Sequence, residues 1–244
     1  MNKLQRIIDD RPDFHRNETE ISRHFSPAES LLPPETAAQL ASEGRTCYGI
    51  ESEVLRFIAD TVSQGDRTLE TGAGCSTMVF AVCGATHTAV TPAQSEIDLI
   101  KQYATRHEIS LQSVHFVPES SETYLPRCDK GELDLVLLDG KHAFPWPTLD
   151  WFYTADRLRR GGLMIIDDAC LPSVGLLADF MKADPAWDLV RDFEGKTLAF
   201  RKTRDSVHDV AWHMQPFTVR RSGNSERQNF GRRIARRIKR ALKQ

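Results

Sequence analysis

The chain has 244 residues, 40% of them hydrophobic, and a formal net charge of -2, which allows one sizeable core. Its apolar runs stay below the roughly 18 residues of a membrane-spanning helix, and residues 1–18 lack the apolar segment of a signal peptide. Five cysteines, an odd number without a Cys-x-x-Cys pair, argue against a disulfide framework or a structural zinc site. We therefore expect a cytoplasmic protein with reduced cysteines.

Residues 1–46 are interpreted as an N-terminal helical extension or lid that packs on the core or covers the site. Their short apolar patches are broken by four prolines, and Pro34 fits near the start of a short helix that runs through Leu40 and ends at Gly44. The next segment has apolar residues at helical spacing. The sequence therefore predicts a helix from Ile50 to Val62.

The rest of the chain alternates between strand-like and helix-like patterns. The predicted strands are Thr68–Glu70, His87–Val90, Leu111–Val117, Leu133–Leu138, Leu163–Ile166, Trp187–Phe193 and Thr197–Phe200. The predicted helices include Met78–Val82, a segment with Ile97, Ile100 and Tyr103, a crossover helix after the fourth strand, and Val174–Met181. This order predicts an α/β protein with a doubly wound, Rossmann-like sheet over residues 47–204, mostly parallel with an antiparallel C-terminal edge hairpin.

Acidic side chains follow two of these strands. Asp139 ends the fourth strand, and Asp167 and Asp168 end the fifth. Because parallel strands of one sheet end at the same edge, the three carboxylates should meet in one crevice, where a cation or a proton would offset their repulsion. Hard oxygen ligands suit magnesium. The alternative is that these acids cap helices or form turns.

A glycine-rich turn follows the first strand. Its sequence is Glu70-Thr71-Gly72-Ala73-Gly74, without the third glycine of a dinucleotide fingerprint, and the chain has no GK[ST] of a P-loop. Glycines allow the backbone to approach a ligand closely, and the next helix start presents free N–H groups. Glu70 would repel a phosphate but suits a cationic group such as an amino acid ammonium. A tight connection without a ligand is the alternative.

From Gly49 to Lys202 the chain resembles class I S-adenosylmethionine-dependent methyltransferases. The turn is similar to the family's first motif, which implies that it cradles the methionine part of the cofactor. Ser76 and Thr77 fall at the helix start, and the Ser120–Ser121 pair resembles the pair near the adenine. The expected cofactor contacts are Glu70, Gly72, Ala73, Gly74, Ser76, Thr77, Thr91, Ser120, Ser121 and Asp139.

The end of the second strand departs from the family pattern. The family usually places there an acid that binds both ribose hydroxyls, whereas this chain has Ala89-Val90-Thr91-Pro92. Thr91 can supply one hydrogen bond, and Glu96 can reach back from the following helix. The resemblance therefore leaves two candidates for the ribose contact.

Within that family, the stretch from Asp139 to Asp168 is similar to the metal-dependent O-methyltransferases that act on catechols, caffeoyl-CoA and macrolide sugars. The resemblance implies that Asp139, Asp167 and Asp168 hold a divalent ion, usually magnesium, which lowers the pKa of a bound hydroxyl. It also implies a general base at His142, with Lys141 as the alternative, and an imidazole suits that role near neutral pH. We expect methyl transfer to a hydroxyl of a small-molecule or glycosidic acceptor.

Other interpretations remain open. One is a metal-independent O- or N-methyltransferase, and another is a nucleoside-binding protein without turnover. The aromatic residues near the fourth strand also have two interpretations. Leu149, Phe152, Tyr153 and Leu158 fit the buried face of the crossover helix, whereas Phe144 and Trp146 precede that helix beside the site, so substrate contact is as well supported for this pair as a packing role.

Residues 205–244 form a basic C-terminal tail. From residue 220 onward there are ten Lys and Arg and one acid, whereas residues 1–219 hold 22 bases and 33 acids. Apolar residues recur every four positions at Phe230, Ile234, Ile238 and Leu242. A helix there suits an anionic membrane surface or an acidic partner, and a solvated end that docks on the acidic body is the alternative. No module favours nucleic acid, and a homo-oligomer remains open.

Overall fold

The computed structural model describes residues 2–12, 14, 49–128, 131–208 and 210–222. The predicted helix from Pro34 to Leu40 and the amphipathic tail segment 230–242 lie outside these residues, so both stay predictions. In the described ranges, none of the helices has the length and apolar character needed to cross a membrane.

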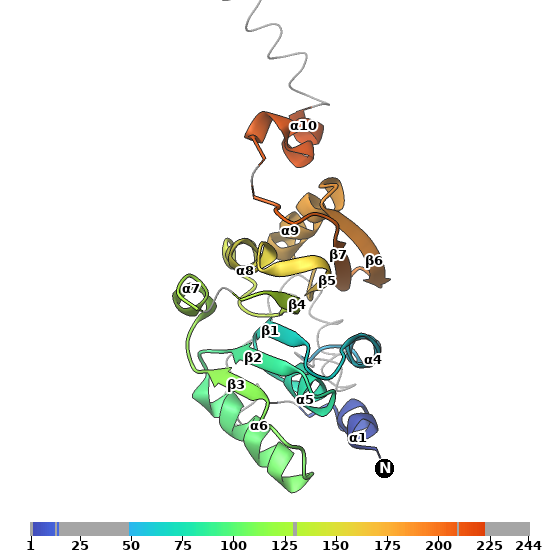
Figure 1. The fold of residues 1–244 in the computed structure, drawn as a ribbon, viewed down its shortest axis with the longest axis vertical. Helices are drawn as coiled ribbons and strands as arrows, with labels where there is room; N and C mark the ends of the chain where they lie inside the picture. Colours follow the sequence, from blue (N-terminus) through green and yellow to red (C-terminus); the bar gives the residue numbers. More distant parts are fainter. Residues whose placement is uncertain (1, 13, 15–48, 129–130, 209, 223–244) are drawn as a thin grey trace, which may run out of the picture.

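The core of the protein is a seven-stranded sheet in the order β3-β2-β1-β4-β5-β7-β6 (Figure 1). The strands are β1 Arg67–Thr71, β2 Thr86–Val90, β3 Val114–Val117, β4 Leu133–Leu138, β5 Leu158–Ile166, β6 Trp187–Phe193 and β7 Thr197–Lys202. Strands β1 to β5 are parallel, and β7 runs antiparallel to both β5 and β6. This topology confirms the predicted Rossmann-like sheet with its antiparallel edge hairpin.

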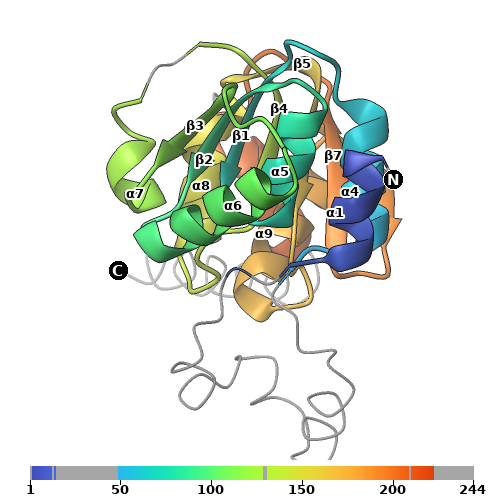
Figure 2. The ribbon, with the colours of Figure 1, turned by 90° about the horizontal axis from the view of Figure 1, so that it is seen from below.

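The described helices cover both faces of the sheet. They are α1 Lys3–Asp10, α4 Ser52–Thr61, α5 Cys75–Val82, α6 Gln94–Arg106, α7 Ser121–Tyr124, α8 Trp146–Ala155, α9 Pro172–Ala183, the 3-10 turn Trp212–Met214 and α10 Pro216–Ser222. One hydrophobic cluster joins the sheet to α1, α4, α5 and α6, and a second joins it to α8 and α9. Figure 2 shows α1 beside α4 and α5.

Strand β4 illustrates why the fully buried part of a central strand is apolar, here from Leu135 to Leu138. Leu135 and Leu137 belong to one cluster, and Val136 and Leu138 belong to the other. Because successive side chains of a strand point to opposite faces, the part of a strand that is covered on both faces needs apolar residues at successive positions. Asp134, near the start of β4, is only partly buried. The apolar run ends at Leu138, where the strand leaves the core, and Asp139 is the next residue.

The described part of the N-terminal extension packs on the core beside α5. Ile7 and Ile8 are buried, and the Tyr103 hydroxyl donates to Asp10 Oδ2 at 2.6 Å. The Cys75 thiol donates to the Pro12 carbonyl oxygen at 3.2 Å. The extension therefore reaches the first residue of α5, directly after the glycine-rich turn.

Two details of the predicted crossover helix are wrong. Helix α8 ends at Ala155, and Leu158 begins β5, where it pairs with Leu133. Phe152 is 49% exposed, whereas Trp151 is 7% exposed. The buried face consists of Pro147, Asp150, Trp151, Thr154 and Ala155. This set has the same helical spacing as the predicted one but is rotated around the helix, because Asp150 and Thr154 are polar residues that face inward.

Strand β3 is shorter than predicted, since it begins at Val114 instead of Leu111. The backbone N–H of Val114 donates to the Leu111 carbonyl oxygen at 3.0 Å. This local hydrogen bond forms a turn, so the residues before Val114 do not extend the strand.

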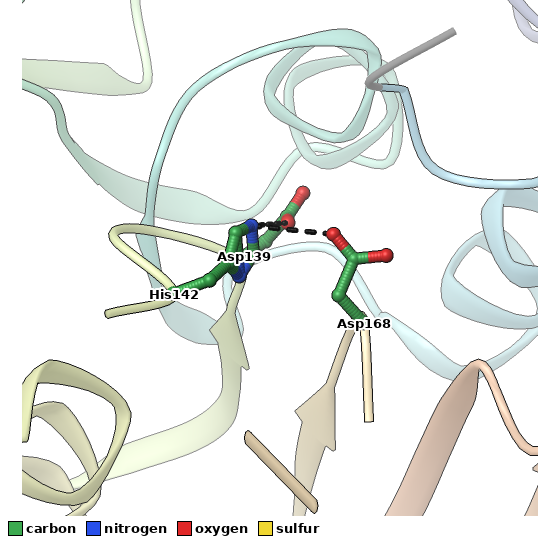
Figure 3. Close-up of side chains that lie close together, drawn as sticks. All are labelled: Asp139, His142 and Asp168. Atoms are coloured by element: carbon green, nitrogen blue, oxygen red, sulfur yellow. Dashed lines mark ion pairs between the residues drawn. The ribbon is translucent and has the colours of Figure 1, made fainter. Parts of the chain in front are cut away.

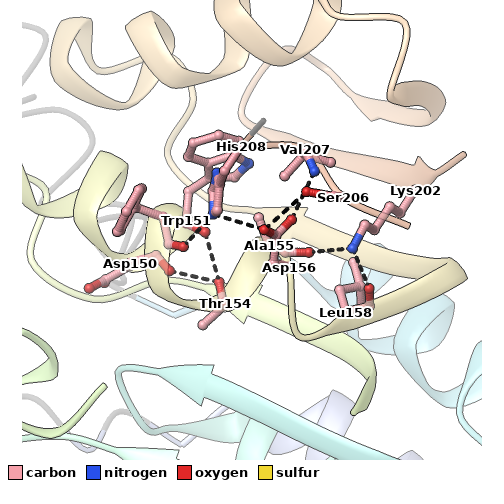
Figure 4. Close-up of polar contacts among 11 residues, drawn as sticks. Asp150, Trp151, Thr154, Ala155, Asp156, Leu158, Lys202, Ser206, Val207 and His208 are labelled. Carbon is pink, nitrogen blue, oxygen red and sulfur yellow. Dashed lines mark hydrogen bonds and ion pairs between the residues drawn. The ribbon is translucent and has the colours of Figure 1, made fainter. Parts of the chain in front are cut away.

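The chain after β7 docks on the C-terminal end of α8 (Figure 4). The Lys202 ammonium is buried and donates to the carbonyl oxygens of Ala155 at 2.8 Å and Leu158 at 2.7 Å. The Val207 N–H donates to Asp156 Oδ1 at 2.8 Å, and the His208 ring stacks on Phe152 with 4.6 Å between centroids. Burial lowers the pKa of Lys202. The chain after β7 therefore packs on the sheet domain, and the Phe217 ring of α10 also lies 5.8 Å from the Phe180 ring of α9, measured between centroids.

Candidate active site

The glycine-rich turn passes close to the end of β4. Gly72 has φ +87°, and a Cβ at this position would lie 2.3 Å from the Asp139 carbonyl oxygen. Such a contact is impossible for an L-residue without a backbone shift, so the turn requires glycine at position 72. Ala73 is buried, and the Gly74 N–H donates to Thr77 Oγ1 at 3.0 Å. The predicted cofactor cradle is thus a tight turn held against Asp139.

Glu70 lies beneath this turn, only 1% exposed. Its carboxylate accepts hydrogen bonds from Ser76 Oγ at 2.6 Å and from Thr77 Oγ1. The His87 Nε2 atom lies 3.1 Å from Glu70 Oε1, and the Thr68 hydroxyl lies 2.8 Å from His87 Nδ1. Three of the predicted cofactor contacts, Glu70, Ser76 and Thr77, therefore bind one another and join the start of α5 to β1 and β2.

The end of β2 carries the other predicted donor-side contacts. The Thr91 hydroxyl donates to Glu96 Oε2 at 2.7 Å, and Thr91 is buried. Glu96 belongs to the first turn of α6. Its carboxylate therefore reaches back to the residue that follows β2, where the resembled family places its ribose-binding acid.

Ser120 and Ser121 lie at the start of the short helix α7. Ser120 is the N-cap residue, and its Oγ lies 3.0 Å from Thr123 Oγ1. Ser121 is buried beside Asp150, a buried acid of α8 that was not predicted as a site residue. Burial raises the pKa of Asp150 to about 6, although the hydroxyls of Ser121 and Thr71 oppose this shift. Asp150 therefore interacts with side chains at the ends of β1 and at the start of α7.

The ends of β4 and β5 bring together Asp139, His142 and Asp168 (Figure 3). His142 Nε2 lies 3.2 Å from Asp168 Oδ2 and 4.0 Å from Asp139 Oδ1. One ligand atom of each residue lies within 4.8 Å of the other two. We call these three residues the acid–histidine cluster. Two predicted metal ligands and the predicted base therefore share one small volume.

Asp167 is bound differently from the other two acids. It is buried and accepts a hydrogen bond from Thr197 Oγ1 of β7. The Lys196 ammonium lies 3.3 Å from Asp167 Oδ2 and 3.8 Å from Asp168 Oδ1. Lys196 belongs to the turn between β6 and β7 and was not predicted as a site residue. The sequence carries no signal that this turn folds back onto the acids.

The charges in this region are not balanced. Burial raises the pKa of Asp139 well above its usual range, and the negative charges of Asp167 and Asp168 add to the effect. Burial and Asp167 likewise raise the pKa of Asp168. For Lys196, burial lowers the pKa, but the attraction of Asp167, Asp168 and Asp139 outweighs it, so the net shift is upward. An added proton or cation would therefore stabilise the carboxylates.

Lys141 points to another group. Its Nζ lies 3.6 Å from the centre of the Trp146 ring, a cation–π contact. Phe144, between them in the loop, is 65% exposed. Of the two candidate bases, His142 is therefore the one that contacts the acids.

Comparisons with known proteins point to a methyltransferase domain. A family model described as a methyltransferase domain matches residues 69–169. A search of curated protein sequences found no match.

Several solved structures share the fold. The cofactor-bound Rv0187 protein from MTB is 18% identical with a TM-score of 0.56, covering 72% of this chain and 92% of its own. The O-methyltransferase NovP is 16% identical with a TM-score of 0.56 and coverages of 68% and 88%. A protein from Klebsiella pneumoniae, proposed to be an O-methyltransferase, is 14% identical with a TM-score of 0.56 and coverages of 76% and 94%.

The matched domain runs from β1 to the residue after Asp168, and so includes both the glycine-rich turn and the acid–histidine cluster. The matched domain supports an S-adenosylmethionine-dependent methyltransferase, and the fold is similar to those of O-methyltransferases. The resemblance inferred from the sequence is thereby confirmed.

Proposed function

We propose that the protein transfers a methyl group from S-adenosylmethionine to a hydroxyl of a small-molecule or glycosidic acceptor, with a divalent ion, most suitably Mg²⁺, at the acid cluster. The observation that carries this proposal is the position of His142, whose Nε2 lies 3.2 Å from Asp168 and 4.0 Å from Asp139. A base is thereby held beside two carboxylates at the edge of the sheet where α/β proteins bind ligands.

The donor would bind over the ends of β1 and β2. The tight turn at Gly72–Gly74 and the start of α5 offer a backbone cradle for its methionine part. The Glu96 carboxylate, held by Thr91 at 2.7 Å, is the candidate for the ribose hydroxyls. Ser120 and Ser121 remain candidates for the adenine side. Together these groups would fix the methyl donor while the acceptor is positioned from the other side.

The residues present fit a divalent ion. The carboxylates of Asp139 and Asp168 are hard oxygen donors, one from each of two neighbouring strands. When bound, the ion would lower the pKa of an acceptor hydroxyl. The His142 imidazole would then take the hydroxyl proton, and the neighbouring Asp168, 3.2 Å from Nε2, would stabilise the imidazolium. Asp167, held by Thr197 and Lys196, would support the site from behind.

A metal-independent methyltransferase is the second candidate, and one observation favours it. The Lys196 ammonium already lies beside Asp167 and Asp168, at 3.3 and 3.8 Å. A built-in cation reduces the need for an added one. In this case His142 would act as the base without an ion.

A transfer assay decides between the candidates. Labelled-methyl transfer from S-adenosylmethionine would be measured over a panel of hydroxylated and amine acceptors, first with EDTA and then with excess Mg²⁺. The proposal expects label on oxygen, loss of transfer in EDTA and recovery with Mg²⁺. Full transfer in EDTA would show that no metal is required. Label on nitrogen alone would exclude a hydroxyl as the acceptor.

For the basic residues 220–244 we propose contact with an anionic membrane surface. Their ten bases and single acid support this proposal. Sedimentation with anionic vesicles would be compared for the full chain and for a chain that ends at residue 222. Equal binding by both chains would refute it.

A further inference from the structure

The turn between β6 and β7 holds Lys196 in a defined position. Glu194 and Gly195 have φ values of 53° and 73°, and the Lys196 N–H donates to the Phe193 carbonyl oxygen at 3.0 Å. Two successive residues with positive φ, closed by this hydrogen bond, form a tight turn, and three residues separate the paired Phe193 and Thr197. Asp192 Oδ1 also accepts from the Gly195 N–H at 2.7 Å. The start of β7 is therefore fixed by backbone geometry and not only by the lysine side chain.

The same turn is bonded to the loop that follows β5. The Ala169 N–H donates to the Lys196 carbonyl oxygen at 2.7 Å, and the adjacent Thr197 hydroxyl donates to Asp167. The Lys196 ammonium adds its ion pairs with Asp167 and Asp168. Backbone and side-chain contacts thus join the hairpin turn to both acids, which places the ammonium inside the candidate site.

The ammonium and His142 contact different oxygens of Asp168. Lys196 Nζ lies 3.8 Å from Oδ1, whereas His142 Nε2 lies 3.2 Å from Oδ2. Asp167 keeps its hydrogen bond from Thr197 in addition to the ion pair. Each acid therefore has a second partner that would remain if the ammonium were removed.

The charges of the site show what the ammonium does. Three carboxylates and one ammonium carry a formal charge of two negative charges. That is the charge that one divalent ion neutralises, whereas the acids alone carry three. An ion bound to Asp168 would lie about 2.0–2.6 Å from its oxygen, and so close to the Lys196 ammonium. The ion and the ammonium are both positive, and two like charges a few ångströms apart repel strongly where water is partly excluded.

We propose that Lys196 is the resident cation of the acid cluster and that a divalent ion binds there only in competition with its ammonium. The inference rests on the proposed function to the extent that Asp139 and Asp168 are taken as the ion's ligands. Loss of a group that orients metal ligands usually weakens metal binding by about 10–100-fold. Here Thr197 and His142 still hold the two acids, so the removal of repulsion decides the direction.

The test measures Mn²⁺ binding by electron paramagnetic resonance at pH 7.5 for the wild type and for Lys196→Met, Lys196→Gln, Lys196→Arg and Lys182→Met. We expect Lys196→Met and Lys196→Gln to bind Mn²⁺ roughly tenfold tighter or more than the wild type. Lys196→Arg keeps the charge and should resemble the wild type. Lys182 is exposed on α9, so Lys182→Met is the matched control. Thermal unfolding shows which of the two neutral variants is folded, and its Mn²⁺ affinity is the one compared.

Unchanged or weaker Mn²⁺ binding by the neutral variants would overturn the inference, and so would no binding by them at millimolar Mn²⁺. The transfer assay in EDTA tests the proposed function separately. If transfer is independent of metal and Lys196→Met still binds Mn²⁺ more tightly, the proposed role of the metal in transfer is wrong, but the inference about Lys196 stands. Metal-dependent transfer with unchanged affinity keeps the function and removes the inference.

Discussion

The two halves of the candidate site differ in how their polar groups are paired. In the donor half, at the ends of β1 and β2, the buried Glu70 accepts from Ser76 and Thr77 and lies beside His87. In the acceptor half, at the ends of β4 and β5, three acids share one ammonium and one imidazole, and burial raises the pKa of Asp139 and Asp168. Polar groups that are fully hydrogen-bonded keep the structure of the donor half rigid, whereas the excess negative charge of the acceptor half favours an added proton or cation.

This difference predicts that substitutions in the two halves have separable effects. Donor-half changes should alter cofactor affinity or stability, and acceptor-half changes should alter the rate of transfer. The largest effect is expected at His142. Its replacement by alanine should reduce methyl transfer by about 10²–10⁴-fold, because the base beside Asp168 is lost. The measurement is labelled-methyl transfer at saturating S-adenosylmethionine.

Lys141→Ala is the matched control for His142→Ala. Lys141 contacts the Trp146 ring and is expected to change transfer only a few-fold. If Lys141→Ala abolished transfer while His142→Ala kept it, the assignment of the base would be reversed. Equal and small effects of both would show that neither residue is the base.

Gly72→Ala tests the shape of the donor half. The positive φ and the close Asp139 carbonyl oxygen should make it unfold at lower urea concentration, with a loss of about 2 kcal/mol or more, and should weaken S-adenosylhomocysteine binding measured by calorimetry. Gly65 has a similar φ of +88° but open space around it. Gly65→Ala should therefore cost about 1 kcal/mol and leave binding unchanged. Equal losses for the two variants would mean that the approach to Asp139 is unimportant.

Asp150→Asn tests the buried acid that contacts both Thr71 and Ser121. The pKa of Asp150 is raised from 3.8 to about 6 in the folded chain, so the folded state binds its proton more tightly. The stability that this proton supplies is complete below pH 3.8 and is lost as the pH rises through 6. Asparagine stays neutral, so the stability of Asp150→Asn relative to the wild type should rise by about 2–3 kcal/mol between pH 4 and pH 7.5.

Urea unfolding of both proteins at several pH values measures this difference. The raised pKa values of Asp139 and Asp168 act in both proteins and largely cancel in the comparison. Parallel stability curves for the two proteins would contradict the assignment of a raised pKa to Asp150.

Glu96→Gln is expected to have the smallest effect. It keeps the hydrogen bond from Thr91 but removes the carboxylate charge. We expect S-adenosylhomocysteine to bind several-fold more weakly, with a cost of roughly 1 kcal/mol, and the thermal unfolding temperature to stay unchanged. Glu119→Gln, which changes a partly exposed acid paired with Arg127, is the control. Equal affinity for both variants would exclude Glu96 as the ribose contact.

Most of the fold was predictable because its signals are local. The predicted strand Leu133–Leu138 matches β4 at both ends, since its buried residues Leu135–Leu138 form a continuous apolar run that ends at Asp139. The start of β5 was not predictable. Leu158 was assigned to the crossover helix with Tyr153, although the two are five positions apart, and its pairing with Leu133 places it in β5.

The candidate site was predictable where sequence order implies proximity. Parallel strands end at one edge, so Asp139 and Asp168 were expected to meet, and they do. Lys196 was missed because it enters from a hairpin whose approach to Asp167 depends on the antiparallel edge of the sheet. The sequence does contain a signal for Asp150. It is an acid four residues before Thr154, and this helical spacing places both on the same, buried face.

The most direct test of the division into donor and acceptor halves combines two measurements on Asp168→Asn. Calorimetry gives its affinity for S-adenosylhomocysteine, and the labelled-methyl assay gives its transfer rate. Since Asp168 contacts His142 and Lys196, we predict an affinity within about threefold of the wild type and a transfer rate lower by roughly 100-fold or more. Full transfer activity, or loss of S-adenosylhomocysteine binding by the folded variant, would contradict the proposed acceptor half.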